Sequence, residues 1–304
     1  MRRNKSLIVA ISLVHKKIIK MKNDEFYIGW MNNAPKSFAG TIKKYLLVLL
    51  PIIIVLGVLL ALSQKKFGTG NFEFGTLTEV KGIYSRTPVP NLKVLNGKDI
   101  WGNRNYITVP LIGYGKFGAD GIIADLEKEK NISMQGKNIT LKGTLLYNDG
   151  KLLMQIDEND KPLLNVAENK EADAAPKTKE LGTLDVKGEI VDPKCFFGVM
   201  KPGEGKPHKD CAIRCILGGM PPVLKVEDES GKENYYLIVG SKGEKINEAV
   251  KDFVASPVEL RAKAIQYDDW IVLYVNTENG LQRYSYVAEH YGNMYASCTS
   301  ECLK

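Results

Sequence analysis

The stretch "ITLKGTLLYNDGKLLMQI", residues 139–156, consists of two strand-like apolar runs on either side of an Asp-Gly pair. Asp149-Gly150 is a strong turn signal between two strands. A second stretch, "VELRAKAIQYDDWIVLYV" at residues 258–275, aligns with the first over 18 positions without a gap. Apolar residues match apolar ones at nearly every position that would face a core, so the sequence predicts the same β-hairpin twice.

The similarity between the two halves extends upstream of the hairpins. The segment "FGTLTEVKGIY" (74–84) matches "LGTLDVKGEIV" (181–191) with an offset of one residue. Between these segments and the hairpins, each half has an apolar run that ends in glycine, "VPLIGYGKFG" (109–118) and "YLIVGSKG" (236–243). A duplicated module is the simplest interpretation of these matches.

Each copy is predicted to contain a strand, a variable connection, two further strands, a short helix and the hairpin. The helices are expected at residues 118–129 and 245–255, where apolar residues recur at about helical spacing. Five strands with a helix before the last hairpin is the element order of an OB-type barrel, and an SH3-like barrel is the alternative. We therefore expect a mainly β protein with two tandem OB-like domains, each with a short helix.

The positive charge of the chain is concentrated at its N-terminal end. Of the net charge of +7, residues 1–44 supply ten Lys and Arg residues against only Asp24 and Glu25. The remainder is close to neutral, and it lacks the basic surface of a nucleic-acid-binding domain. We expect no nucleic-acid partner.

Residues 45–63, "YLLVLLPIIIVLGVLLALS", form 19 consecutive uncharged positions. As a helix they would reach about 30 Å, enough to cross a bilayer, and Pro51 is tolerated in such helices. The preceding basic residues place the N-terminus in the cytoplasm. A cleaved signal peptide is a poorer interpretation, because the first apolar run at residues 7–14 is short and lacks a cleavage pattern. We expect a single-pass protein of a bacterial inner membrane, with its domains in the periplasm.

The expected organisation follows from these signals, with either Met1 or Met21 as the start of the chain. It comprises a basic cytoplasmic segment (1–44), a transmembrane helix (45–63), a first OB-like domain (70–160), a linker (161–180), a second OB-like domain (181–290) and a cysteine-containing tail (291–304).

Three of the five cysteines lie in "VDPKCFFGVMKPGEGKPHKDCAIRCILGGMPP", residues 191–222. On a helix, His208, Cys211 and Cys215 would share one face, and Cys195 would arrive from the end of the preceding strand. Three thiolates and an imidazole suit a four-coordinate site for a transition metal such as zinc, copper or iron. The loop is one of those that line the binding face of an OB-type barrel.

Oxidised cysteines are the main alternative to a metal site. Thiols outside the cytoplasm are often oxidised, and five cysteines allow two disulfides with one thiol left over. Cys195 could bridge either of its partners, whereas Cys211 and Cys215 are poorly placed to bridge each other on a helix. A thiol-exchange role for Cys211 and Cys215 also stays open.

A second, weaker set of candidate ligands lies near the C-terminus. The residues His290, Met294, Cys298 and Cys302 recur every four positions, and these residue types suit Cu(I). A disulfide that ties the tail to the module is an equally good interpretation. Met200 is a further possible thioether ligand, although packing in the loop is the simpler role.

From about residue 21, the chain resembles a family of bacterial membrane-anchored proteins of uncharacterised activity. The resemblance is carried by "DEFYIGW", by "LIGYGKFGA", and by "GEIVDPKCFFGVMKPGEGKPHKDCAIRCILGGMPPV", which contains the pattern Cys…GKxHxxCAxxCxxxGxPP. It implies a cell-envelope location and makes Cys195, His208, Cys211 and Cys215 one motif. It implies no reaction.

The function expected from the sequence is that of an accessory protein rather than an enzyme. The glycines of "GYGKFG" (113–118) lack the context of a phosphate-binding loop, and HExxH, GxSxG and Walker patterns are absent. We expect the second domain to bind a transition metal or a metal cofactor, in the service of a membrane redox or envelope complex. The alternatives are a thiol-disulfide exchange protein and a structural adaptor with a disulfide-stapled loop.

Overall fold

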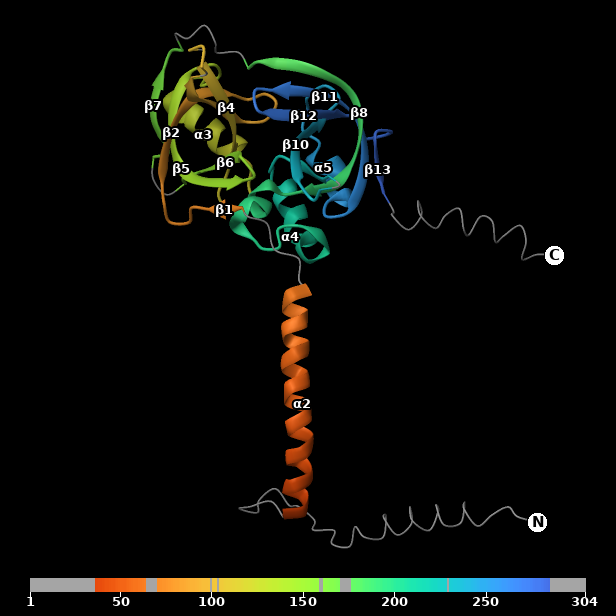
Figure 1. Ribbon diagram of the computed structural model, residues 1–304. Coiled ribbons are helices and arrows are strands. Elements are labelled where there is room, and N and C mark those ends of the chain that lie inside the picture. Colours follow the sequence, from red (N-terminus) through yellow and green to blue (C-terminus); the bar gives the residue numbers. More distant parts are fainter. Residues whose placement is uncertain are drawn as a thin grey trace, which may run out of the picture. The chain divides into compact units, whose positions relative to one another are not determined.

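We describe the protein from a computed structural model (Figure 1). The structure describes residues 36–63, 70–98, 100–102, 104–158, 161–169, 176–228 and 230–284. The chain divides into two compact units, Met1–Lys66 and Phe67–Lys304. Among the described residues, the first unit contributes helix α2 and the second unit contains the strands.

Helix α2 (Lys36–Ser63) is 28 residues long and contains Pro51. Within it, the segment Phe38–Ser63 contains an 18-residue window with a mean hydropathy of 3.1, and none of that window is buried. The helix is therefore long and apolar enough to cross a membrane. It begins at Lys36 rather than at Tyr45, so the last basic residues before the apolar stretch, Lys43 and Lys44, are helical.

Five strands close the first barrel in the order β2–β3–β4–β6–β5 and back to β2. Strands β4 and β6 pair in parallel, and the other neighbours are antiparallel. The helix α3 lies between β4 and β5 in the chain, and β1 and β7 add to β5 outside the ring. The bounds are β1 Asn71–Phe72, β2 Thr78–Ser85, β3 Asn91–Lys98, β4 Arg104–Ile112, α3 Asp120–Lys130, β5 Asn138–Asn148, β6 Lys151–Ile156 and β7 Leu163–Ala167.

The second barrel has the same strand order, β8–β9–β10–β12–β11 and back to β8. Again the third and fifth strands in chain order, β10 and β12, are neighbours in the ring and pair in parallel. The bounds are β8 Thr178–Val191, η1 Cys195–Val199, α4 Gly205–Leu217, β9 Val223–Glu227, β10 Glu233–Gly240, α5 Asn247–Val250, η2 Lys251–Phe253, β11 Pro257–Tyr267, β12 Trp270–Val275 and β13 Leu281–Arg283. The expectation of small OB-like barrels, each with a short helix before its last hairpin, is confirmed.

The two hairpins begin and end at aligned positions of the repeated stretch. In the first, Asn148 pairs with Lys151 across the turn, and in the second, Tyr267 pairs with Trp270. Asp149 and Asp268 occupy the corresponding turn position and both have positive φ, 45° and 49°. Aspartate tolerates this left-handed conformation better than most residues, which explains its presence in both turns.

Each barrel has its own apolar core, and a third cluster of buried side chains joins the two. Trp270 is fully buried in this shared cluster, where it stacks on Phe197 with ring centroids 6.4 Å apart. Its indole Nε1 donates to the carbonyl of Thr108 in the first barrel at 3.0 Å. The barrels, which lie side by side in Figure 1, therefore form one packed body.

Two expectations about secondary structure need correction. Leu163–Ala167, within the predicted linker, forms strand β7 on the first barrel, because its pairing with β5 satisfies backbone groups that a linker would leave to water. The predicted helix at 245–255 is shorter, since it consists of α5 and the single turn η2. The tail at residues 291–304 lies outside the described residues.

Candidate metal centre

The cysteine motif forms an insertion of two helical segments, η1 and α4, between β8 and β9. Helix α4 buries Ala212 and Ile216 in the core of the second barrel. It ends at a Gly-Gly pair, where the amide of Gly219 donates to the carbonyl of Ile216 at 2.9 Å and φ of Gly219 is 101°. Only glycine adopts this conformation readily, so the pair ends the helix.

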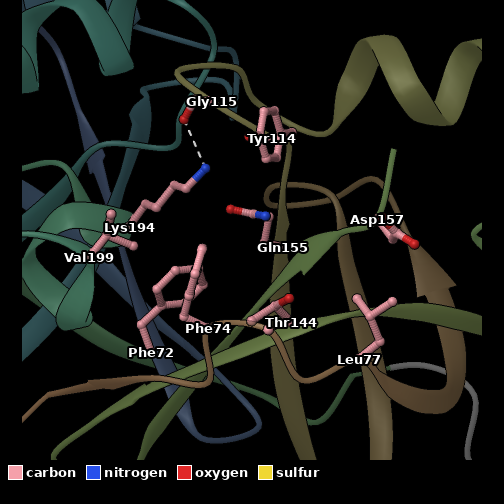
Figure 2. A pocket seen from close by; sticks show the side chains of 11 residues that line it. Phe72, Phe74, Leu77, Tyr114, Gly115, Thr144, Gln155, Asp157, Lys194 and Val199 are labelled. Atoms are coloured by element: carbon pink, nitrogen blue, oxygen red, sulfur yellow. Dashed lines mark hydrogen bonds between the residues drawn. The ribbon is translucent and has the colours of Figure 1, made fainter. Parts of the chain in front are cut away.

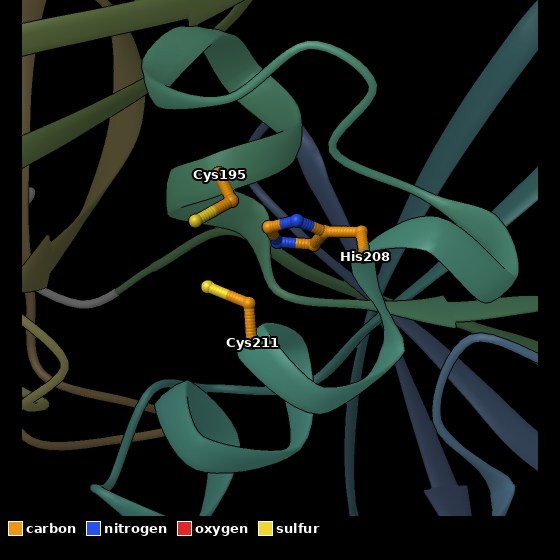
Figure 3. Close-up of side chains that lie close together, drawn as sticks. All are labelled: Cys195, His208 and Cys211. Atoms are coloured by element: carbon orange, nitrogen blue, oxygen red, sulfur yellow. The ribbon is translucent and has the colours of Figure 1, made fainter.

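Four predicted ligands meet in this insertion. The ligand atoms of Cys195, His208 and Cys211 all lie within 4.8 Å of one another. In Figure 3 the two sulfur atoms point into the same space, and the imidazole ring of His208 approaches from a third direction. Cys215 belongs to an overlapping group with Cys195 and Asp192, whose ligand atoms also lie within 4.8 Å of one another. Cys195 is thus common to both groups.

Cys195 lies at the start of the single turn η1, immediately after the end of β8. Backbone hydrogen bonds hold this turn: the amide of Phe196 donates to the carbonyl of Asp192 at 3.0 Å, and that of Met200 donates to the carbonyl of Cys195 at 3.1 Å. The sequence predicts the arrival of Cys195 from a strand end, but the turn that aims its side chain depends on these contacts.

Asp192 was not among the predicted ligands, although it lies three residues before Cys195. Its side chain is fully buried, and its Oδ1 accepts a hydrogen bond from the backbone amide of Lys194 at 2.9 Å. Its Oδ2 has no hydrogen-bond partner among the described residues. A buried carboxylate oxygen of this kind is costly unless it meets a donor or a cation, so Asp192 belongs with the candidate ligands.

Lys116 of the first barrel reaches the cysteines of the second. Its ammonium donates to Sγ of Cys211 at 2.8 Å and to Sγ of Cys215 at 3.8 Å. The loop "GYGKFG", which has no phosphate-binding context in the sequence, is therefore a wall of the cysteine site. The sequence did not predict a role for Lys116. Its contact with the cysteines joins two barrels, and local sequence patterns do not predict how two domains pack together.

The 113–118 loop is held in place by a close backbone approach. The amide of Gly118 donates to the carbonyl of Gly218, at the end of α4, at 3.0 Å. A Cβ atom at Gly118 would lie 2.1 Å from the carbonyl oxygen of Gly219. Glycine is required here because any side chain would push the loop away from the site.

The surroundings favour the neutral forms of two of the ligands. The hydrogen bond with Cys215, followed by burial, raises the pKa of the Cys195 thiol. Burial lowers the pKa of His208, so its imidazole is neutral at physiological pH, which is the form that binds metals. His208 is 3% exposed, and its Nε2 has no hydrogen-bond partner in the described parts of the chain.

The cysteines that the structure describes, Cys195, Cys211 and Cys215, are free thiols. Met200 follows η1 and is 46% exposed, and it belongs to neither group of candidate ligands. The weaker candidates His290, Met294, Cys298 and Cys302 lie outside the described residues.

Comparison with known proteins adds no relative from which a role can be transferred. No family model matches the chain, and no curated protein matches it in sequence. The chain itself offers a group of cysteine and histidine residues that could hold a metal ion, without a disulfide among the described cysteines.

Proposed function

We propose that the protein is a membrane-anchored accessory protein that binds a transition metal through Cys195, His208, Cys211 and Cys215. The observation that carries this proposal is the convergence of two sulfur atoms and an imidazole nitrogen within 4.8 Å, at a buried histidine whose Nε2 has no partner among the described residues. A structural role for His208 would leave its Nε2 with a partner. A metal ion supplies one.

The spacing of these atoms suits tetrahedral coordination. With metal–sulfur bonds of about 2.3 Å, the ligand atoms of a tetrahedral site lie about 3.8 Å apart, so the observed group needs only a small contraction. Cys215 can complete the site through the space it shares with Cys195, and the carboxylate of Asp192 is a competing fourth or outer ligand. The soft donor set favours zinc, Cu(I) or iron over calcium and magnesium.

Metal binding is tested on the full chain purified in detergent under reducing conditions. We expect one equivalent of zinc, copper or iron by elemental analysis, and replacement by Co²⁺ should give the intense thiolate-to-cobalt absorption of a sulfur-rich tetrahedral site. Cys195→Ala and His208→Ala should each reduce affinity by about tenfold to a hundredfold or more, because each removes a ligand.

Asp149→Asn is the matched control, since Asp149 lies in the β5–β6 turn and outside both ligand groups. It should leave metal content unchanged. A reduced, metal-replete protein that retains no transition metal would overturn the proposal.

A thiol-exchange role is the second candidate, and one contact favours it. Cys211 is partly exposed, and the Lys116 ammonium beside its sulfur would stabilise a thiolate. The structure changes the pair expected from the sequence: Cys195, not Cys215, lies within 4.8 Å of Cys211. Rapid alkylation of Cys211 in the metal-loaded protein, with a reducible Cys195–Cys211 bridge after mild oxidation, would favour this role over metal storage.

We also propose the cellular setting on the grounds of charge and hydropathy. Helix α2 would cross the bacterial inner membrane with the basic N-terminal segment in the cytoplasm, as the excess of Lys and Arg before the apolar stretch favours. Both barrels would then lie in the periplasm, where a membrane redox or envelope complex is the proposed partner. The resemblance to membrane-anchored bacterial proteins supports this setting.

A further inference from the structure

A pocket of about 500 Å³ lies between the first barrel and the turn η1 (Figure 2). Its volume falls within the range of small-molecule sites, about 300–1,000 Å³. The apolar part of the wall consists of Phe72, Phe74, Leu77, Tyr114 and Val199. No ligand of the proposed metal centre lines this pocket.

Three buried polar side chains also line the pocket: Thr144, Gln155 and Lys194, which are 7%, 8% and 4% exposed. The side chains of Thr144 and Gln155 have no hydrogen-bond partner among the residues that the structure describes. In Figure 2 the amide of Gln155 lies in the middle of the pocket, between Lys194 and Thr144. The pocket keeps this hydroxyl and this amide accessible, because neither is among the fully buried, unpartnered polar atoms of the described residues, so both are available to hydrogen-bond a ligand.

The ammonium group of Lys194 can also donate a further hydrogen bond. It donates to the carbonyl oxygens of Gly113 and Gly115 at 3.0 and 2.8 Å, which uses two of its three protons. Within the described chain no carboxylate lies within ion-pair distance of it. An anionic oxygen in the pocket would supply the missing counter-charge.

We propose that this pocket binds a small, mainly apolar carboxylate. Its carboxylate accepts hydrogen bonds from Lys194 and Gln155, and its ring or short chain packs on Phe72, Phe74 and Val199. Asp157, the one acidic residue of the lining, lies across the pocket from Lys194 in Figure 2, so the charges favour the Lys194 end for the anion. This site is separate from the proposed metal centre and does not depend on it.

Fluorine NMR of para-trifluoromethyl-phenylacetate in the presence of the full chain in detergent tests the proposal. The matched neutral probe is the corresponding phenylethanol, which has the same ring but no carboxylate. We expect the carboxylate to bind the wild-type protein, and the alcohol to bind about tenfold or more weakly. Lys194→Met should weaken carboxylate binding by a similar factor, whereas Lys206→Met, on the exposed side of α4, should not change it.

Thr144→Val and Gln155→Met keep the proposal testable if Lys194→Met does not fold. Each should weaken carboxylate binding by about threefold or more and leave the midpoint of thermal unfolding nearly unchanged, because each removes an accessible group without a protein partner. A purely structural role for these side chains predicts a lower midpoint and unchanged binding. Equal binding of the acid and the alcohol, or unchanged binding by all three variants, would overturn the proposal.

Discussion

At the residue scale, the cysteine site depends on small groups as much as on its ligands. Gly118 and the Gly218-Gly219 pair allow the loop of one barrel to approach the helix end of the other, which brings Lys116 to Cys211. The glycines of "GYGKFG" are visible in the sequence, but the reason for them is not. Their role is a close backbone approach between segments about a hundred residues apart in the sequence.

Gly118→Ala should lower the free energy of unfolding by about 1–3 kcal/mol, because its Cβ would overlap the carbonyl of Gly219. It should also weaken metal binding, since the displaced loop carries Lys116. Gly121→Ala is the matched control. It lies in α3 with open space around its Cα, so it should be neutral or stabilising by up to about 1 kcal/mol. Urea unfolding of both variants checks the prediction, and equal effects would contradict it.

At the element scale, the sequence predicts most of the secondary structure. The matched apolar positions and the turn signals predict both hairpins, whose first strands, β5 and β11, bury alternate residues. Helix α4 carries His208, Cys211 and Cys215, whose spacing places them on one face of a helix. The single turn η1 is different. No periodicity predicts it, since its position is set by packing of Phe196 and Phe197 against Tyr235, with ring centroids 5.6 and 5.3 Å apart.

The hydroxyl of Tyr235 links this turn to the first barrel. It donates to the carboxylate of Glu233 at 2.7 Å and accepts from Nδ2 of Asn148 at 3.2 Å. Tyr235→Phe should therefore lower the free energy of unfolding by about 1 kcal/mol at neutral pH, because Asn148 and Glu233 lose a partner. Urea unfolding measures this loss, and an unchanged stability would contradict it.

Tyr235 also makes the free energy of unfolding depend on pH. Burial, followed by the hydrogen bond with Glu233, raises the pKa of Tyr235 above its ordinary value of 10.0. Its contribution to stability is therefore complete below pH 10 and falls at higher pH, where the unfolded chain loses the proton that the folded chain retains. The stability difference between wild type and Tyr235→Phe should shrink as the pH is raised above 10.

At the scale of the whole molecule, the two barrels form one packed body. The cluster that joins them contains residues of both, among them Ile112 and Leu153 from the first and Trp270 and Val239 from the second. The candidate metal centre lies at this junction, and so does the proposed ligand pocket. Since loss of the junction exposes apolar surface on both barrels, we expect them to unfold in one cooperative transition.

Trp270→Ala should lower the free energy of unfolding by about 3–5 kcal/mol, because it removes a fully buried aromatic ring and the hydrogen bond to Thr108. Trp101→Ala is the control: Trp101 is 80% exposed, so its replacement should change stability by less than about 0.5 kcal/mol. Calorimetry should show one transition in the wild type. Two separate transitions would show that the barrels are independent.

The sequence by itself determined the apolar helix, the two OB-like barrels and three of the cysteine site's candidate ligands on one helix face. These features follow from patterns within single elements, where burial of one face imposes a fixed period. Only the tertiary structure decided that the barrels share a core, that Lys116 and Asp192 join the cysteines, and that Lys194 is buried beside a pocket. Those contacts join segments distant in the chain, and their energy depends on burial and charge that no local period encodes.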